Sequence, residues 1–318
     1  MKTISKILFG LLCLTFYNCE DILEEDISDD IVFTIYPTQD LIIESNVVNF
    51  QWNELDGADD YRLQIFNTSQ VKLVDTLISQ TQIILPLSEG NYQWRVRGEN
   101  SAYQSTYSLP VSFEVNESED LTSQQIILSS PVNNFMTNSD NFTLGWNTLS
   151  AADYYNLQLI NNTLGGTIVF QQNNILSNTL TLNSTILSQD GNYTWKIKGV
   201  NAVSETVFSS RDFSLDTTLP NQPVNGVPAN NSIQTINQNI NFNWSIAADS
   251  GVIQSSISYR IEISNDVNFT TILQTSNIST NSFQQLFNST GDYYWRVRAV
   301  DAAGNNGPFS NAFKFTIN

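Results

Sequence analysis

The stretch GDYYWRVRAVD, Gly291–Asp301, decides the fold, because two close copies of it precede it in the same chain. They read GNYQWRVRGEN at 90–100 and GNYTWKIKGVN at 191–201. In each copy, aromatic and aliphatic residues alternate with polar or charged ones. An alternation of period two is typical of a β-strand with one buried and one exposed face. The copies therefore predict one strand that recurs in three similar units.

Other landmarks recur with the same spacing. In each unit a proline stands 15 or 16 residues before the first of two tryptophans, and all six tryptophans of the chain fall on these two positions. The copies of the motif begin at residues 90, 191 and 291, so each unit is about 100 residues long, which is the size of a small independent domain. Short alternating strands separated by Gly, Asn, Asp and Ser turns predict β-sandwiches. The residues concerned are Pro37, Trp52 and Trp94, then Pro131, Trp146 and Trp195, then Pro228, Trp244 and Trp295.

Each unit resembles a fibronectin type III domain. The resemblance rests on the tryptophan of the second strand, a tyrosine in the third, and a Tyr-x-aromatic-x-Val-x-Ala sixth strand. The third unit fits this last motif, while Gly98 and Gly199 replace the alanine in the first two units; the matching residues are Tyr293, Trp295, Val297 and Ala299. The resemblance implies a two-sheet sandwich of seven strands.

The family also closes a corner between the sixth-strand tyrosine and an upstream leucine. The candidate leucines stand five, six and seven residues before that tyrosine, at Leu87, Leu187 and Leu286, so the resemblance implies an irregular corner.

The predicted fold class is all-β, with three tandem immunoglobulin-like (fibronectin type III-like) β-sandwiches after a signal peptide and an acidic tether. The signal peptide spans 1–18 and the tether 19–30; the three domains span 31–116, 125–216 and 221–318. The linker 116–125 is polar, whereas 216–228 carries prolines, which favour an extended, semi-rigid junction. The third unit also carries a six-residue insertion between Trp244 and Tyr259.

The N-terminus predicts export and lipid attachment. Lys2 and Lys6 precede an apolar run that is too short for a membrane span and ends at Cys19. A cysteine at this place resembles the acylated cysteine of bacterial lipoproteins; the alternative is an ordinary signal peptide cut nearby. The following segment, 20–30, carries seven acidic residues and no basic one, which predicts a solvated tether. Acidic residues directly after the lipid cysteine resemble a surface-export signal, with a spacer on the periplasmic face as the alternative.

Composition excludes several classes of function. The chain has 318 residues, 13 basic and 31 acidic side chains and a net charge of −18. Nucleic-acid binding requires a basic surface, so we expect no nucleic-acid partner. The chain has no histidine, and its two cysteines, Cys13 and Cys19, lie at the N-terminus, so sites that depend on histidine or thiolate are not expected in the sandwiches.

No group of residues predicts catalysis, so we expect no catalytic residue, no cofactor and no enzyme activity. Asp59 and Asp60 are adjacent, whereas acid–base pairs stand opposed across a substrate. Asp249 and Asp301 lie in glycine-containing loops that offer oxygen ligands for calcium, but without an EF-hand spacing the prediction is no metal. Triplets at Asp75 and Asp216 resemble bacterial O-glycosylation acceptors, with Thr76 and Thr217 as the modified residues.

Basic residues predict a possible partner-binding stripe. In the strand pattern they point outward from the third and sixth strands, which are neighbours in one sheet of this fold. Eight of the 11 basic residues that follow the signal lie there. The alternative is internal pairing with Glu114, Asp212 and Glu262, which also point outward. The stripe consists of Arg62, Arg95, Arg97, Lys196, Lys198, Arg260, Arg296 and Arg298.

Two functions follow as expectations. The first is a non-catalytic, membrane-anchored surface lipoprotein that acts as a protein-binding, adhesion or scaffold module of the outer membrane. The second is a carbohydrate-binding accessory lipoprotein of a glycan-processing system. Sugar binding would need exposed aromatic rings, for which Tyr103, Tyr107 and Phe208 are the candidates. The expected partners are the membrane, through the N-terminal lipid, and a protein or glycan.

Overall fold

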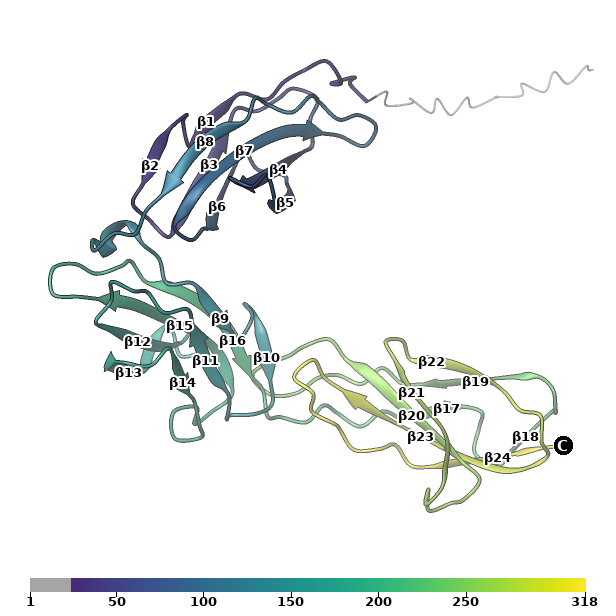
Figure 1. Cartoon of the computed structure of the whole chain (residues 1–318). Coiled ribbons are helices and arrows are strands. Elements are labelled where there is room, and N and C mark those ends of the chain that lie inside the picture. The colour runs from purple at the N-terminus through teal and green to yellow at the C-terminus, as the bar shows by residue number, and fades with distance from the viewer. Residues whose placement is uncertain (1–23) are drawn as a thin grey trace, which may run out of the picture. The chain divides into compact units, whose positions relative to one another are not determined.

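The computed structural model describes residues 24–318, and the predictions for the signal peptide, Cys19 and residues 20–23 lie outside the described residues. The regular elements of the described chain are all β-strands except for one short 3₁₀ turn, so the all-β prediction is confirmed (Figure 1). Within 24–318, no helix has the length and apolar character that a membrane crossing requires.

The first sandwich pairs a three-stranded sheet, in the order β1-β3-β6, with a five-stranded sheet, in the order β2-β8-β7-β4-β5. Its strands are β1 (Thr34–Tyr36), β2 (Leu41–Ile43), β3 (Val47–Trp52), β4 (Asp60–Asn67), β5 (Lys72–Ile78), β6 (Gln82–Pro86), β7 (Gly90–Glu99) and β8 (Val111–Val115).

The second sandwich repeats this plan, with sheets in the orders β14-β11-β9 and β10-β16-β15-β12-β13, after a short 3₁₀ turn. Its elements are η1 (Leu121–Ser123), β9 (Leu128–Ser130), β10 (Phe135–Thr137), β11 (Thr143–Trp146), β12 (Tyr154–Asn161), β13 (Thr167–Ile175), β14 (Thr179–Thr181), β15 (Gly191–Val200) and β16 (Ser209–Leu215).

The third sandwich has sheets in the orders β17-β19-β22 and β18-β24-β23-β20-β21. Its strands are β17 (Asn225–Val227), β18 (Ser232–Gln234), β19 (Asn239–Trp244), β20 (Ser258–Ser264), β21 (Ile272–Ile278), β22 (Ser282–Leu286), β23 (Gly291–Val300) and β24 (Phe313–Ile317).

Each domain has eight strands among the described residues where the family resemblance implies seven, because the first strand is split between the two sheets. In the first domain, β1 pairs antiparallel with β3, and β2 pairs parallel with β8 in the other sheet. Pro37 follows β1, and proline has no N–H to continue a ladder of hydrogen bonds. Pro131 and Pro228 stand in the same place in the other domains, so each proline marks where the chain changes sheets.

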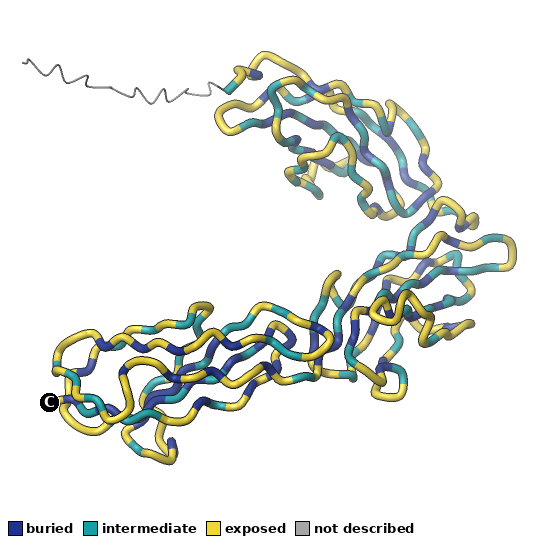
Figure 2. Tube along the Cα trace, turned by 180° about the vertical axis from the view of Figure 1, so that it is seen from behind, coloured by how far each residue is buried: buried dark blue, intermediate teal, exposed yellow. Residues whose placement is uncertain are grey.

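The core of each sandwich is built around its two tryptophans. All six are buried, with exposed fractions between 0 and 3%. In β7 the buried Tyr92, Trp94 and Val96 alternate with half-buried residues, as the sequence predicts, and Figure 2 shows this alternation along the strands. Three hydrophobic clusters result, one in each repeated unit of the described chain. The repeated motif is therefore core, and its aromatic rings do not form a surface platform.

The tyrosine corner is regular, which differs from the irregular corner that the resemblance implies. In each domain the corner tyrosine lies in the long strand β7, β15 or β23. Its hydroxyl donates to the backbone carbonyl four residues upstream, at 2.8 Å for Tyr92, 2.6 Å for Tyr193 and 3.1 Å for Tyr293. The predicted corner leucine Leu286 is wrong, because it is 44% exposed at the end of β22 while Phe287 is buried. The backbone acceptor fixes the corner, so the position of the leucine can vary.

Residues 24–30 belong to the first sandwich, so the prediction of a solvated tether over 19–30 does not hold for this part. Ile27 is fully buried, and its side chain lies over Gly98. The backbone of this segment is also held, because Asn100 donates to the Glu25 carbonyl at 2.9 Å and the Thr106 amide donates to the Asp30 carbonyl at 3.0 Å. One apolar side chain and these hydrogen bonds outweigh the tendency of the acidic residues to stay solvated.

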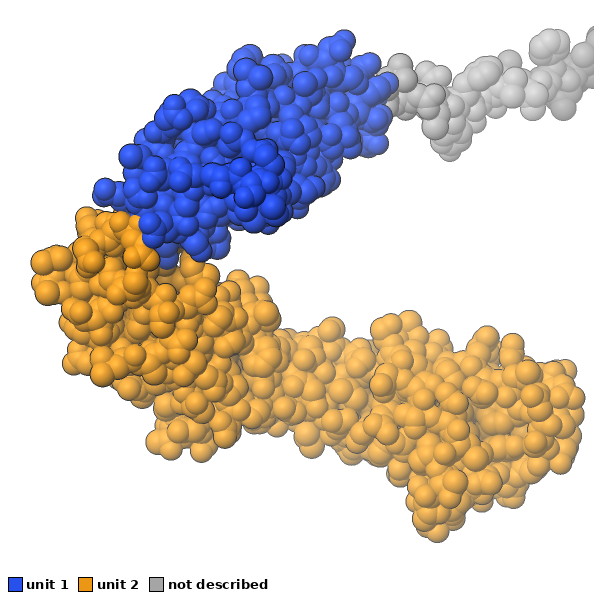
Figure 3. Space-filling model, in the orientation of Figure 1, with its two compact units in different colours: residues 1–116 blue, residues 117–318 orange. Residues whose placement is uncertain are grey.

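The chain divides into two compact units, residues 1–116 and 117–318 (Figure 3). The first unit contains the first sandwich, and the second contains the other two. Within the second unit, Asn305 of the third sandwich donates to the backbone carbonyl of Asp216 at 2.7 Å, and the Asn221 amide donates to the Ala248 carbonyl at 3.1 Å. The linker between these two sandwiches is therefore held by hydrogen bonds in addition to its prolines.

Candidate functional site: the cationic ladders

The third and sixth strands of the predicted pattern are β4 and β7, β12 and β15, and β20 and β23, and each pair is adjacent in its five-stranded sheet (Figure 1). The eight predicted cations alternate with buried residues along these strands, so they lie on the outward face of the sheets. We call each group a cationic ladder and keep the three ladders separate. The first ladder is Arg62, Arg95 and Arg97; the second is Lys196 and Lys198; the third is Arg260, Arg296 and Arg298.

Each ladder lies against an aromatic ring that the sequence analysis did not connect with it. In the third domain, Arg296 and Arg298 lie 4.0 and 4.7 Å from the centre of the Phe309 ring. Tyr107 takes this place in the first domain and Phe208 in the second. These distances are typical of cation–π contacts. The sequence does contain a signal for this ring, because an aromatic residue followed by serine stands 13, 13 and 14 residues after the second tryptophan of the three units.

The following serine locks this arrangement in the first and third domains. The Val96 amide donates to the Ser108 hydroxyl at 3.1 Å, and the Val297 amide donates to the Ser310 hydroxyl at 2.9 Å. The ring is thereby fixed across the sixth strand, where it orders the long cationic side chains. Two of the three rings considered for sugar binding, Tyr107 and Phe208, are thus engaged by cations, while Tyr103 is exposed.

In the first ladder two of the three cations are matched by carboxylates. Arg62 and Arg97 stand opposite each other in β4 and β7, and both donate to Glu99, with closest distances of 2.7 and 2.6 Å. Burial raises the pKa of Glu99, but the hydrogen bonds from both arginines outweigh burial, so the pKa lies below its usual value. Asp75 accepts from Lys72 and Arg62, which lower its pKa to about 2. Arg95 is held by the amide of Gln64.

The second ladder is partly matched. Lys198 donates to Glu205 at 2.6 Å, and Lys196 lies against Phe208. Asp212, which the sequence analysis considered as an acidic partner, instead accepts from the Thr194 hydroxyl. Since lysine is a compact charge on a flexible stem, this ladder lacks the bidentate geometry of the arginine ladders.

The third ladder carries an excess of positive charge. Glu262, which is 5% exposed, accepts from Arg296 at 2.7 Å and pairs with Arg260 at 3.2 Å. No carboxylate within residues 24–318 lies within 4.0 Å of the Arg298 guanidinium, and its buried Nε has no hydrogen-bond partner. Burial, followed by the charges of Arg260 and Arg296, lowers the pKa of Arg298.

The cause of this excess is one residue. Arg260 and Arg298 stand opposite each other in β20 and β23, as Arg62 and Arg97 do in the first domain. Glu99 bridges the first pair, whereas Val300 occupies the corresponding position in the third domain. Like charges directly opposite each other destabilise a sheet. The third ladder therefore has a place for a carboxylate that the sandwich itself does not supply.

Among the solved structures that resemble the chain are two from animal and bacterial proteins. The crystal structure of chicken CNTN1 FN1-FN3 domains is 14% identical and has a TM-score of 0.45, covering 90% of this chain and 97% of that one. The Clostridium thermocellum CbhA fibronectin(III)-like modules are 13% identical with a TM-score of 0.39, covering 61% and 93%. No family model and no curated protein matches the sequence.

The three domains are β-sandwiches that share one topology, each with a three-stranded and a five-stranded sheet. The fold by itself does not indicate a ligand.

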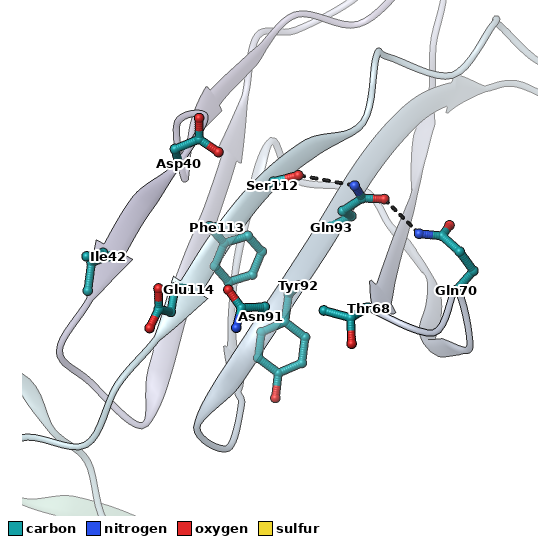
Figure 4. A pocket seen from close by; sticks show the side chains of 10 residues that line it. All are labelled: Asp40, Ile42, Thr68, Gln70, Asn91, Tyr92, Gln93, Ser112, Phe113 and Glu114. Atoms are coloured by element: carbon teal, nitrogen blue, oxygen red, sulfur yellow. Dashed lines mark hydrogen bonds between the residues drawn. The ribbon is translucent and has the colours of Figure 1, made fainter.

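A hollow of about 420 Å³ lies on the first sandwich (Figure 4). Its floor is polar, with Gln70 donating to Gln93 at 3.0 Å and Gln93 donating to Ser112 at 3.1 Å. The ring of Tyr92 borders it but stacks on Phe113 within the core. The two glutamine amides are thus paired, and both aromatic rings that line the hollow are buried, so it offers no free aromatic face for a sugar.

The structure also locates the two aspartates considered for calcium and the two glycosylation candidates. Asp249 and Asp301 lie close together, and Asp216 joins them, which the sequence analysis missed. Thr76 is half-buried in β5, and the Thr217 hydroxyl donates to Asp190 at 2.9 Å. Glycosylation of either threonine stays a prediction.

Proposed function

We propose that this chain is a non-catalytic, membrane-anchored surface lipoprotein that binds an acidic protein partner through the third cationic ladder. The observation that supports it is Arg298, an arginine on a sheet face that has no carboxylate partner within residues 24–318. In the first domain, Glu99 completes the equivalent arginine pair. A carboxylate from a partner would do the same for Arg260 and Arg298.

A partner carboxylate fits this place better than another ligand chemistry. Arginine forms bidentate, charge-assisted hydrogen bonds with planar carboxylates. The guanidinium of Arg298 is already positioned against Phe309, so little side-chain freedom is lost on binding. The remainder of the chain is acidic, which would repel an acidic partner elsewhere and direct it to this ladder.

We expect Arg298→Glu to weaken capture of the partner roughly tenfold or more, because charge-assisted hydrogen bonds contribute about 1.5–3 kcal/mol. The new carboxylate would pair with Arg260 and Arg296, so the melting temperature should stay unchanged or rise. The measurement is capture by the tagged mature chain from detergent-solubilised membranes, with calorimetry of both proteins. A double variant, Arg296→Glu with Arg298→Glu, is less informative. The new carboxylate at position 296 would face the buried carboxylate of Glu262, with which Arg296 normally pairs.

Lys198→Glu is the matched control, because it makes the same change of charge at the equivalent position of the second domain. Lys198 already has Glu205 as a partner, so this variant should capture the partner as the wild type does. Capture by Arg298→Glu at the wild-type level would place the docking surface elsewhere. Equal loss in both variants would mean that overall charge, and not this ladder, attracts the partner.

Lipid attachment at Cys19 gives the second prediction. Without Lys2 and Lys6 the chain has 11 basic and 31 acidic residues, a net charge of −20, so electrostatic attraction to an anionic membrane is not available. Buried acyl chains contribute about 0.8 kcal/mol per CH₂, and stable anchoring requires more than one chain. Mass spectrometry of the native N-terminus should find an acylated Cys19 as the first residue, and Cys19→Ser should leave the membrane fraction. An unmodified peptide that spans residues 18–22 would contradict the proposal.

A further inference from the structure

Three aspartates meet where the linker of the second sandwich reaches the third. Asp216 directly follows β16, Asp249 lies in the insertion after β19, and Asp301 directly follows β23. Each offers a carboxylate oxygen, and these oxygens all lie within 4.8 Å of one another. Two ligands on opposite sides of one calcium ion are separated by about 4.6–5.2 Å, because each calcium–oxygen distance is about 2.3–2.6 Å. One ion can therefore contact all three carboxylates.

Asp216 is a buried carboxylate with an oxygen that has no partner. Its side chain is fully buried, and one oxygen accepts from the Thr218 amide at 3.0 Å. The other oxygen, Oδ2, is buried without any hydrogen bond. Burial, together with the nearby carboxylates of Asp301 and Asp249, raises the pKa of Asp216 to about 6. A buried charge that lacks a compensating partner is costly, so a cation at this place would satisfy it.

The other two domains show what normally occupies this place. Asn100 and Asn201 stand where the third domain has Asp301. The amide of Asn100 donates to the backbone carbonyls of Glu25 and Gly57, at 2.9 and 2.7 Å. The amide of Asn201 donates in the same way to Glu119 and Ala151. In both domains the asparagine side-chain amide thus joins the segment that enters the domain to the loop that follows β3 or β11.

In the third domain this donor is replaced by an acceptor. The Asp301 carboxylate accepts from the backbone amide and the side-chain amide of Asn305, each at 2.8 Å. It cannot donate to the incoming chain, which here presents the Asp216 carboxylate. The insertion adds a third acceptor, Asp249, whose oxygens accept from Ser250 and Ser255. The amide-to-carboxylate exchange and the insertion therefore bring three carboxylates together at one point. The side-chain amide of Asn305 donates there to Asp301 and to the Asp216 backbone carbonyl, but no lysine or arginine among residues 24–318 forms an ion pair with any of the three aspartates.

The surrounding loops are packed closely enough to hold an ion in a fixed place. Gly251 has a φ of +91°, and a side chain there would lie 2.8 Å from the Thr218 hydroxyl, so only glycine allows this approach. Ser250 donates to the Leu219 carbonyl at 2.7 Å. Asp190 binds the hydroxyls of Thr217 and Thr218, which fixes the linker from the second domain. The oxygens are thus held by both sandwiches.

We propose that Asp216, Asp249 and Asp301 bind a calcium ion that joins the linker of the second sandwich to the loops of the third. Three carboxylates at flexible loop positions suit calcium, which accepts six to eight oxygen ligands in irregular geometry. Magnesium requires a nearly ideal octahedron and keeps several waters, so it should bind more weakly. Thiolate and imidazole metals are not favoured by a site made only of oxygens.

The experiment is calorimetry of the full mature chain, dialysed against a chelator and then titrated with calcium chloride. At a calcium concentration about one hundred times the Kd, the transition of residues 117–318 should rise by roughly 5–10 °C. The transition of residues 24–116 should not move. Isothermal titration should give one site per chain, with weaker binding of magnesium chloride.

Asp301→Asn is the decisive variant, because it restores the residue that the first two domains carry. We expect it to fold, to bind calcium at least tenfold more weakly, and to melt without calcium at or above the wild-type temperature. Glu117→Gln removes one negative charge from an exposed position of the same unit and should leave the calcium response unchanged. An absent calcium response in the wild type, or an equal response in Asp301→Asn, would overturn the proposal.

Discussion

Trp94→Ala is expected to destabilise the first sandwich by about 3–5 kcal/mol, because a large buried side chain is removed and a cavity remains. Trp94 is fully buried and contacts Phe50 at a ring distance of 5.2 Å. Its indole nitrogen also donates to the Pro37 carbonyl at 3.2 Å, and the acceptor would lose this partner. Most domains have a total stability of about 5–15 kcal/mol, so this domain should unfold well below the wild-type temperature.

Calorimetry and hydrogen exchange followed by mass spectrometry would measure this effect domain by domain. Peptides from residues 117–318 should keep their protection in Trp94→Ala, since they belong to a separate compact unit. Ile42→Ala is the control, because that side chain in β2 is mostly exposed and its truncation should change stability little. Loss of protection throughout the chain in Trp94→Ala would show that the sandwiches do not unfold independently.

Glu262→Ala is expected to destabilise the third sandwich by about 2–3 kcal/mol, because it removes the carboxylate between Arg260 and Arg296. The pair is partly open to solvent on the arginine side, which keeps the expected loss below that of a fully buried pair. After the change, Arg260, Arg296 and Arg298 would face one another without a compensating charge. Urea unfolding, with the two sandwiches of residues 117–318 followed separately, would measure the loss.

Glu262→Gln separates the hydrogen bonds from the charge. Gln64 occupies the equivalent position in the first domain and accepts from Arg95 at 3.0 and 2.8 Å. A glutamine at 262 should therefore keep the hydrogen bond to Arg296, and its effect should lie between the wild type and Glu262→Ala. Adding Arg298→Glu to Glu262→Ala should recover part of the stability, because a carboxylate returns to the same arginines. A stability of Glu262→Ala equal to that of the wild type would contradict this account of the ladder.

The sandwich cores were predictable because their signal is local. The period-two alternation of a strand fixes which side chains face inward. A large apolar side chain on the inward face, such as Trp295, is then buried in the core. The family resemblance predicted that the third and sixth strands pair. These are β4 and β7 in the first domain, and their pairing confirms the prediction. The eight ladder cations also lie on the predicted face, because the same alternation sends them outward.

The charge pairing within the ladders was less predictable, because it depends on residues at strand ends and in turns. Glu262 is an acidic partner as predicted, but Glu99 and Asp75 were not considered. Glu99 ends its strand beyond the alternating pattern, and its role depends on reaching back between Arg62 and Arg97. The excess of positive charge at Arg298 became visible only when the position of Glu99 in the first domain was compared with that of Val300 in the third.

The aspartate cluster was the least predictable feature, because its members come from three segments far apart in the sequence. Composition marked Asp249 and Asp301 as oxygen ligands in loops, but nothing in the sequence placed Asp216 beside them. That position depends on how the linker turns after β16 and packs on the third sandwich. The exchange of asparagine for aspartate at position 301 was the available signal, and it gains meaning only from the contacts of Asn100 and Asn201.

The docking of residues 24–30 sets how far the first sandwich can stand from a lipid surface. A free tether from Cys19 to Asp30 would reach about 40 Å, at roughly 3.3–3.6 Å per residue. Ile27 and the Glu25 carbonyl attach this segment to the sandwich, so the length of chain between Cys19 and the attached segment is at most about 18 Å. If Cys19 carries the lipid, the attached segment would therefore lie within about 18 Å of the lipid surface. The loops beside residues 24–30 would then stay close to that surface, where a large soluble partner has little room to approach them.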